Sequence, residues 1–298
     1  MGVKDRAALG AFLEQLSADE RQERTIAEQR AQIDALASFF PPPEGMEVEP
    51  GALGGVAGEW LRAKRARSDA ALLYLHGGGY VIGSPRSHRH LASAIGEAAG
   101  IVVFAADYRL APEHPHPAAV DDAVAAYQGL LDRGMAASQL AIAGDSAGGG
   151  LTVATLVALK ERGLPLPACA VCISPWADLS QGGEAHRARA KRDPIVAKEG
   201  LDQMAAAYLG GADPRTPLAS PAFADLSGLP PLLIQVGTEE ALYDDSFLLK
   251  ARAENAGVEV SLESWAGMIH VWHAFHPILS EGRDAIARIG SYLRSHLE

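Results

Sequence analysis

The sequence has few basic side chains relative to acidic ones and no extended basic cluster. Its 298 residues contain 26 Lys and Arg against 37 Asp and Glu, which gives a net charge of −11 at pH 7. Nucleic acids and anionic membrane surfaces both bind grouped Lys and Arg, so this balance argues against either partner. The basic run from Arg62 to Arg67 is short and is interpreted as a solvated face.

Long apolar runs are also absent. No stretch of 18 apolar residues occurs, and the first 20 residues carry charges throughout in place of an apolar signal core. These absences predict that the protein is neither exported nor inserted into a membrane, and we expect it in the cytoplasm.

Cysteine is nearly absent, with Cys169 and Cys172 as the only two. Their C-x-x-C spacing is found in redox and zinc sites, but here the pair lies inside the apolar stretch ACAVCIS, which is typical of a buried strand. Since successive strand residues alternate between faces, the two thiols are expected on opposite faces of that strand. The sequence therefore favours two inert, buried thiols.

Apolar runs of strand length alternate with helical patterns from about residue 46 onward. Strands are expected at 71–75, 101–106, 140–144, 168–173, 231–237 and 258–264. Helices are expected at 86–99, 117–133, 147–162, 197–209, 244–256 and 281–297. This alternation predicts an α/β fold with a mostly parallel sheet that helices cover on both faces.

Two segments depart from this alternation. Residues 1–40 have helical apolar spacing (Leu9, Phe12, Leu13 and Leu16, then Ile26, Ile33 and Leu36) and end at three consecutive prolines. Residues 180–222 are rich in charge, Gly and Pro around one helix. We predict an N-terminal helical cap at 1–45 and a main domain at 46–298, with an insertion at about 180–222 that completes the cap.

The sharpest local motif is GDSAGG at residues 144–149, between an expected strand and an expected helix. G-x-S-x-G alone is weak evidence, but a Ser at a strand–turn–helix junction forms a nucleophile elbow that raises its hydroxyl above the sheet edge. Free amides and the positive dipole at the helix start favour a developing oxyanion. The alternative is a plain Gly-rich turn in which Ser146 caps the helix.

A second motif, HGGGY at residues 76–80, follows the expected strand at 71–75. Acyl transfer requires N–H donors aimed at the tetrahedral oxygen, and a glycine run lets the backbone supply them. Gly78, Gly79 and Ala147 are the candidate oxyanion hole, and the alternative is a flexible loop. His76 is interpreted as a structural hydrogen-bonding residue.

HGGGY, then DYRLAPE at 107–113, then GDSAGG resemble the hormone-sensitive-lipase-type carboxylesterases of the α/β-hydrolase fold, also called the bacterial acetyl-esterase or lipase family. The motifs fall in the family's order, and the resemblance covers about residues 45–298. It implies a helical cap and hydrolysis of short to medium acyl esters, and it is compatible with a homodimer. Asp107 and Arg109 are interpreted as structural, in an ion pair or a backbone anchor beneath the oxyanion loop.

The acid of the triad follows the Ser in this fold and precedes the His. The commoner family pattern at this point is D-P-L-x-D, and residues 240–244 of this chain read EALYD, which resembles the family variant E-x-L-L-D-D. This alignment gives Glu240 the acid position. Glu239 and Asp244 remain alternatives.

For the base, residues 268–272 read MIHVW, which resembles the M-x-H-V-W of family members with the E-x-L-L-D-D variant. The resemblance selects His270. His273 is the competitor and is expected on a helix surface.

Metal and nucleotide motifs are missing. No H-E-x-x-H, Cys/His cluster or phosphate-binding glycine motif follows a strand, so no metal or cofactor is predicted. The expected activity is ester hydrolysis through Ser146, Glu240 and His270 with an acyl-enzyme intermediate. Amide or lactone hydrolysis on the same triad stays open. A non-catalytic receptor, like the plant gibberellin receptors that this family resembles, is disfavoured because those lose the catalytic His.

Overall fold

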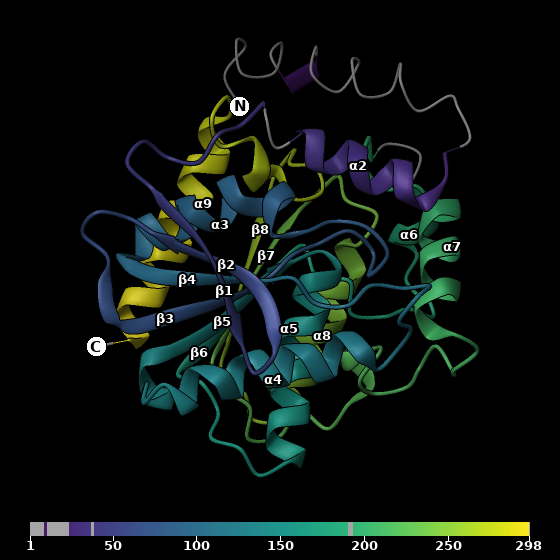
Figure 1. Cartoon of the computed structure of the whole chain (residues 1–298). Helices are drawn as coiled ribbons and strands as arrows, with labels where there is room; N and C mark the ends of the chain where they lie inside the picture. The colour runs from purple at the N-terminus through teal and green to yellow at the C-terminus, as the bar shows by residue number, and fades with distance from the viewer. Residues whose placement is uncertain (1–8, 11–23, 37–38, 190–192, 298) are drawn as a thin grey trace.

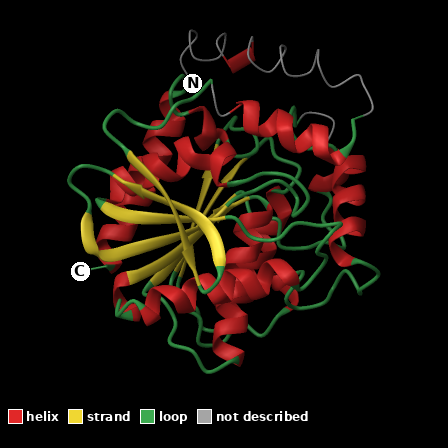
Figure 2. Cartoon of the chain, in the orientation of Figure 1, coloured by secondary structure: helices red, strands yellow, loops and turns green. Residues whose placement is uncertain are grey.

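The computed structural model describes residues 9–10, 24–36, 39–189 and 193–297. In this part of the chain, eight strands form one twisted sheet in the order β1-β2-β4-β3-β5-β6-β7-β8 (Figures 1 and 2). β1 and β2 are antiparallel, β2 pairs antiparallel with β4, and the remaining pairs are parallel. The strands are β1 Glu47–Leu53, β2 Val56–Arg62, β3 Arg67–Leu75, β4 Ile101–Ala106, β5 Leu140–Asp145, β6 Cys169–Ile173, β7 Leu232–Gly237 and β8 Val260–Trp265.

Helices cover both faces of this sheet, as expected for parallel strands joined by crossover helices. α3 and α9 pack together on one face, and α4, α5 and α8 lie on the other (Figure 1). The helices are α2 Ile26–Leu36, α3 Pro85–Ala99, α4 Ala118–Asp132, α5 Ala147–Glu161, α6 Ala185–Ala188, α7 Lys198–Leu209, α8 Tyr243–Asn255 and α9 Ser280–His296, with 3₁₀ turns η1 Ala137–Gln139, η2 Pro221–Phe223 and η3 Trp272–Phe275. The predicted α/β fold with a mostly parallel sheet is confirmed.

The hairpin of β1 and β2 was not predicted from the sequence. β1 is the edge strand and β2 lies between β1 and β4, and the side chains of both are mostly half-buried or exposed. Polar residues therefore interrupt the apolar run that identifies a central strand. β2 joins the sheet beside β4, where the Trp60 and Phe104 rings lie 5.0 Å apart.

The two cysteines lie on opposite faces of β6, as predicted. Cys169 belongs to the core layer beneath α3 and α9, and Cys172 belongs to the layer beneath α5. Both are free and buried, and burial raises the pKa of each thiol to about 12. Neither thiol is therefore ionised at neutral pH.

Three helices lie beyond one end of the sheet rather than on its faces: α2, α6 and α7 (Figure 1). Arg30 of α2 donates to the Val81 carbonyl and forms an ion pair of 2.7 Å with Glu113. Phe12, Leu13 and Leu16, part of the predicted N-terminal helical pattern, lie outside the described residues. Among the described helices, none is both long and apolar enough to cross a bilayer.

Candidate active site

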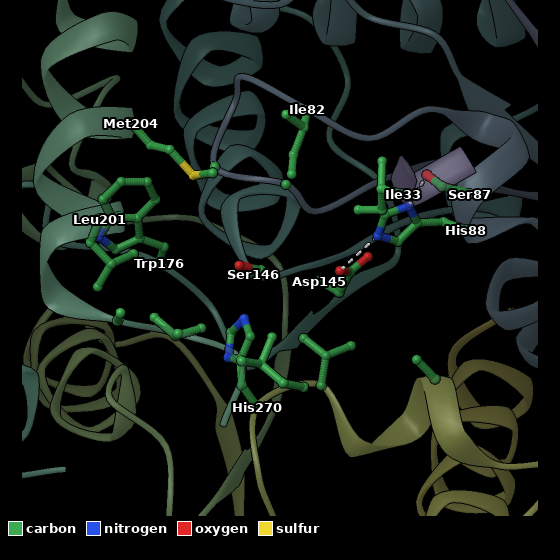
Figure 3. A pocket seen from close by; sticks show the side chains of 18 of the residues that line it. Ile33, Ile82, Ser87, His88, Asp145, Ser146, Trp176, Leu201, Met204 and His270 are labelled. Carbon is green, nitrogen blue, oxygen red and sulfur yellow. Dashed lines mark hydrogen bonds and ion pairs between the residues drawn. The ribbon is translucent and has the colours of Figure 1, made fainter. Parts of the chain in front are cut away.

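A cavity of about 320 Å³ lies at the carboxyl ends of the parallel strands (Figure 3). Loops after β3, β5, β6 and β8 supply Gly78, Ser146, Trp176 and His270 to its floor. Side chains from two other segments form its apolar wall: Ile33 and Phe40 from the N-terminal segment, and Ile195, Val196, Leu201 and Met204 from the segment that contains α7. Carboxyl ends of strands are where α/β folds place their ligands.

Ser146 stands in a sharp turn between β5 and α5. Its φ of 54° and ψ of −121° are unusual for a residue with a side chain, and such strain persists only where the surroundings enforce it. Its amide donates to the Ile173 carbonyl at 2.8 Å, and its carbonyl accepts from the Trp176 amide at 2.9 Å. At Gly148 a Cβ atom would lie 1.9 Å from the Leu75 carbonyl oxygen, so the turn closes only on glycine.

His270 and Glu240 form a buried pair beside this turn. The Nδ1 atom of His270 lies 3.1 Å from Oε2 of Glu240. The other carboxylate oxygen accepts from the Gly237 amide at 2.6 Å and from the Ser174 hydroxyl at 2.7 Å. Burial lowers the pKa of His270, but the hydrogen bond and charge of Glu240 outweigh it, so the net pKa is raised. The carboxylate therefore holds the ring orientation and favours its protonated form.

Ser174 is a functional candidate that the sequence did not reveal. Besides donating to Glu240, its hydroxyl accepts from the Val271 amide at 3.2 Å, so it bridges the loops of the acid and the His. Its φ of 45° places the side chain at this crossing point. A Ser before a Pro at a strand end has no distinctive motif, and only the fold shows this role.

The alternatives to Glu240 and His270 have other hydrogen-bond partners. Glu239 accepts from the Thr238 hydroxyl at 3.1 Å, and Asp244 accepts from the Ala185 amide at 2.8 Å. His273 is buried with its Nε2 atom 2.7 Å from the Gln235 side-chain oxygen, so the expectation of a helix-surface residue is wrong. His273 of the short turn η3 contacts β7 through Gln235, and burial lowers the pKa of His273 to about 3.

Gly78 and Gly79 of the glycine loop after β3 line the cavity. Gly78 has a φ of 111°, which a residue with a side chain rarely adopts. Among the described residues, no acceptor is found for the Gly78 and Gly79 amides. Ala147 opens α5, so its amide has no partner within the helix. None of these three amides therefore has a backbone acceptor within the described part of the chain.

Beside this loop, His76 and Tyr108 of the DYRLAPE segment form a buried pair. The His76 ring stacks on Tyr108 at 4.3 Å, and the Tyr108 hydroxyl donates to the His76 carbonyl at 2.6 Å. Burial lowers the pKa of His76 to about 3, which fits a structural residue. Arg109 forms its ion pair with Asp122 at 2.7 Å. Asp107 is not its partner.

Asp145 is the centre of a buried polar network under the turn. Its carboxylate accepts from the Tyr74 hydroxyl at 2.6 Å and the Gly77 amide at 3.2 Å, and it lies 3.3 Å from His88 Nε2 (Figure 3). Burial opposes the ionisation of Asp145, but His88 and the Tyr74 hydroxyl lower its pKa to about 2. His88 lines the cavity, although its surroundings in the sequence gave no signal for this.

No group of three or more His, Cys, Asp or Glu side chains that could hold a metal ion occurs among the described residues. The arrangement in the cavity offers instead a hydroxyl on a strained turn, a His–carboxylate pair and several free amides. These groups are the components of nucleophilic acyl transfer.

Comparison with known proteins agrees with this geometry. A profile of the α/β-hydrolase fold family matches residues 72–274. An acetyl-hydrolase of Streptomyces hygroscopicus is 52% identical over 276 residues, which cover 93% of this chain and 90% of the relative. An esterase of Acinetobacter venetianus is 35% identical over 267 residues, which cover 89% of this chain and 88% of the relative.

Solved structures give the same result over the whole chain. The crystal structure of an esterase from the bacterial hormone-sensitive lipase family has a TM-score of 0.96 and 48% identity, and the match covers 100% of this chain and 99% of that one. A hormone-sensitive lipase from a metagenome library has a TM-score of 0.93 and 41% identity, with 97% and 98% covered. This chain therefore belongs to the hormone-sensitive-lipase-type carboxylesterases of the α/β-hydrolase fold.

Proposed function

We propose that this protein hydrolyses carboxylic esters with Ser146 as nucleophile, His270 as general base and Glu240 as the acid that orients His270. Ester hydrolysis follows from the family and from relatives named acetyl-hydrolase and esterase. The observation that carries the residue assignment is the single cavity that Ser146 and His270 share, with Glu240 hydrogen-bonded behind the ring.

The mechanism has two acyl-transfer steps. His270 takes the proton of the Ser146 hydroxyl as its oxygen attacks the ester carbonyl, and the oxyanion accepts hydrogen bonds from the amides of Gly78, Gly79 and Ala147. His270 then gives this proton to the leaving alcohol. Water, deprotonated by His270, attacks the acyl-enzyme, and the proton returns to Ser146 as the carboxylic acid leaves.

The cavity supports short to medium acyl chains as substrates. Its volume of about 320 Å³ is at the small end of ligand pockets, and its wall is apolar. Neither a metal nor a cofactor is required by this mechanism. Amide or lactone hydrolysis remains the second candidate, since the same groups perform it, and rates on p-nitrophenyl butyrate and the matching anilide separate the two.

Residues 1–45 and about 180–222 are proposed to form a cap over this cavity. Ile33 of α2 and Met204 of α7 support this division, because both line the cavity from outside the sheet. Deletion of residues 1–40 is expected to change the preferred acyl length. The cytoplasmic location and the homodimer stay predictions, and sedimentation of the purified protein measures the latter.

The direct test of the nucleophile is Ser146→Ala. This variant is expected to lose about 10⁴- to 10⁶-fold in kcat on p-nitrophenyl butyrate, because covalent catalysis is lost while binding survives. Ser295→Ala, at an exposed position of α9, is the control and should retain activity. A Ser146→Ala variant with more than a tenth of wild-type kcat contradicts the assignment.

A further inference from the structure

Residues of the 180–222 segment form hydrogen bonds and an ion pair with the loop that carries Glu240. We call residues 238–245 the acid loop, and the described residues 185–189 and 193–197 the strap. The Ala185 amide donates to Asp244 at 2.8 Å, and His186 Nε2 lies 2.7 Å from Asp245 Oδ1. The Arg189 guanidinium donates to the Thr238 carbonyl. The strap therefore contacts the acid loop on both sides of Glu240.

Asp193 of the strap reaches the acid loop next to the catalytic acid. Its side chain is buried, and its Oδ2 atom accepts from the amide of Ala241 at 2.9 Å. Ala241 directly follows Glu240. The other oxygen, Oδ1, accepts from the amides of Ile195 at 3.0 Å and Val196 at 3.1 Å. Since Ile195 and Val196 line the cavity, one carboxylate connects the acid loop to the substrate-facing wall.

We propose that Asp193 is a positioning residue that fixes Glu240 behind His270 and holds the cavity wall at 195–197 in place. The proposal rests on the proposed triad. A small displacement of the acid tilts the imidazole away from Ser146, and a misplacement of about 1 Å costs roughly 10²-fold in rate.

The local backbone shows why a carboxylate is needed here. Ala241 is the second residue of a turn in which the Tyr243 amide approaches the Glu240 carbonyl at 3.4 Å, so its own N–H points out of the turn. Buried without an acceptor, this N–H would carry the full cost of desolvation. Asp193 Oδ2 supplies the acceptor that the buried Ala241 N–H requires.

The negative charge of Asp193 also acts on His270. His270 is influenced by the negative charges of Glu240, Asp193 and Asp145, all of which raise its pKa against the effect of burial. His273, the nearby ring behind β7, has a pKa of about 3 and is neutral at working pH. Removal of the Asp193 charge is therefore expected to lower the pKa of His270.

Two substitutions separate the two functions of Asp193. In Asp193→Asn one carbonyl oxygen remains, and it satisfies more donors by facing the Ile195 and Val196 amides, which leaves the Ala241 amide opposite an NH₂ group. We expect kcat to fall about 10- to 100-fold with the acyl-length profile unchanged. Asp193→Ala removes both connections and should lower kcat similarly while also changing the ratio of butyrate to octanoate hydrolysis.

The control is Asp178→Asn. Asp178 is also buried, and its carboxylate accepts from the Ser180 amide, the Ser180 hydroxyl and the Gly182 amide within its own turn. Asp178 contacts the acid loop only through its backbone amide, which donates to Asp245 and which the substitution keeps. The kcat and the pH profile of the Asp178→Asn variant should stay near those of the wild type. In Asp193→Asn the acidic limb of kcat/KM should move to lower pH, which a merely structural role does not produce.

Ala241→Pro removes the N–H that donates to Asp193, and proline suits the second position of this turn. It should lower kcat as Asp193→Asn does, and the double variant should lose no more than either single one. This variant keeps the test decisive if Asp193→Ala fails to fold.

Equal kcat and equal pH profiles for Asp193→Asn and Asp178→Asn overturn the proposal, as do additive losses in the double variant. Failure of the triad is distinguished by Glu240→Gln. If that variant keeps wild-type kcat, the assignment of the acid fails, whatever Asp193 does.

Discussion

The floor and the wall of the cavity are built in different ways. Ser146 lies on a strained turn and Glu240 in a loop fixed by buried hydrogen bonds, each at the end of a central parallel strand. The wall consists of apolar side chains, among them Ile33 and Met204, from segments outside the sheet. Backbone geometry therefore determines the chemistry, whereas side-chain packing determines the space for substrate.

This difference predicts different consequences of substitution. Changes in the floor should reduce kcat by orders of magnitude with any ester, because they alter groups that act in the transition state. Changes in the wall should alter the preference among esters and leave the chemistry intact.

After Ser146 itself, the largest effect is expected at Glu240. Glu240→Gln leaves the His270 ring without a charged partner, and loss of the acid in a serine-protease triad costs about 10⁴ in kcat. The acidic limb of kcat/KM should also move to lower pH, because Glu240 contributes most to the raised pKa of His270.

Glu239→Gln is the matched control, since it changes the adjacent side chain in the same loop. It should lose less than about tenfold, because Glu239 contacts Thr238 and not His270. Measuring kcat of both variants on one butyrate ester decides which of the two adjacent glutamates is the acid. An inactive Glu239→Gln together with an active Glu240→Gln contradicts the assignment of Glu240.

A smaller effect, and mainly on stability, is expected at Asp145. Its pKa of about 2, against an ordinary 3.8, corresponds to about 2 kcal/mol of unfolding free energy that is present above pH 4 and lost as pH falls through 2. The pKa of His88 is raised, although burial lowers it, so the contribution of its charge is present below pH 6.5 and lost as pH rises through the raised value.

Asp145→Asn should therefore lower the unfolding free energy by about 2–5 kcal/mol at pH 5.5 and by less at pH 9, as measured in urea. Asp121→Asn, which removes an exposed ion pair with Arg162, should cost at most about 1 kcal/mol at either pH. Equal losses for the two variants at pH 5.5 would show that the buried network does not stabilise the turn.

The smallest effect on activity is expected at Met204 in the cavity wall. Met204 packs against Gly79, where an added Cβ atom would lie 2.0 Å from its sulfur. Met204→Ala should open space beside the oxyanion loop and shift the ratio of octanoate to butyrate hydrolysis about tenfold toward octanoate. Lys198→Ala, an exposed position of the same helix, should leave this ratio unchanged. A ratio unaffected by Met204→Ala would place the acyl chain elsewhere.

The sequence predicted the floor more fully than the wall, for physical reasons. A nucleophile elbow and a glycine loop require particular residues at fixed spacing, so GDSAGG and HGGGY could be located without a structure. The parallel strands were found because both of their faces are buried and their residues are continuously apolar.

Other parts depend on contacts between distant segments and left no local pattern. The β1–β2 hairpin has the mixed polarity of a sheet edge. Ser174, His88 and Asp193 act through partners that are 48 to 97 residues away in the chain, and none of the three lies in a recognisable motif. His273 was misplaced because a His three residues after the base resembles the exposed side of a helix.

The central claim is that an acyl group passes through Ser146. The most direct measurement is a rapid mix of the protein with p-nitrophenyl butyrate, with the release of p-nitrophenol followed in time and the quenched protein digested for mass spectrometry. A burst of about one p-nitrophenol per protein, with a butyryl group on the peptide that contains Ser146 and none in Ser146→Ala, is the predicted result. Wild-type turnover with the butyryl group on another residue, or with Ser146→Ala equally active, would contradict the account.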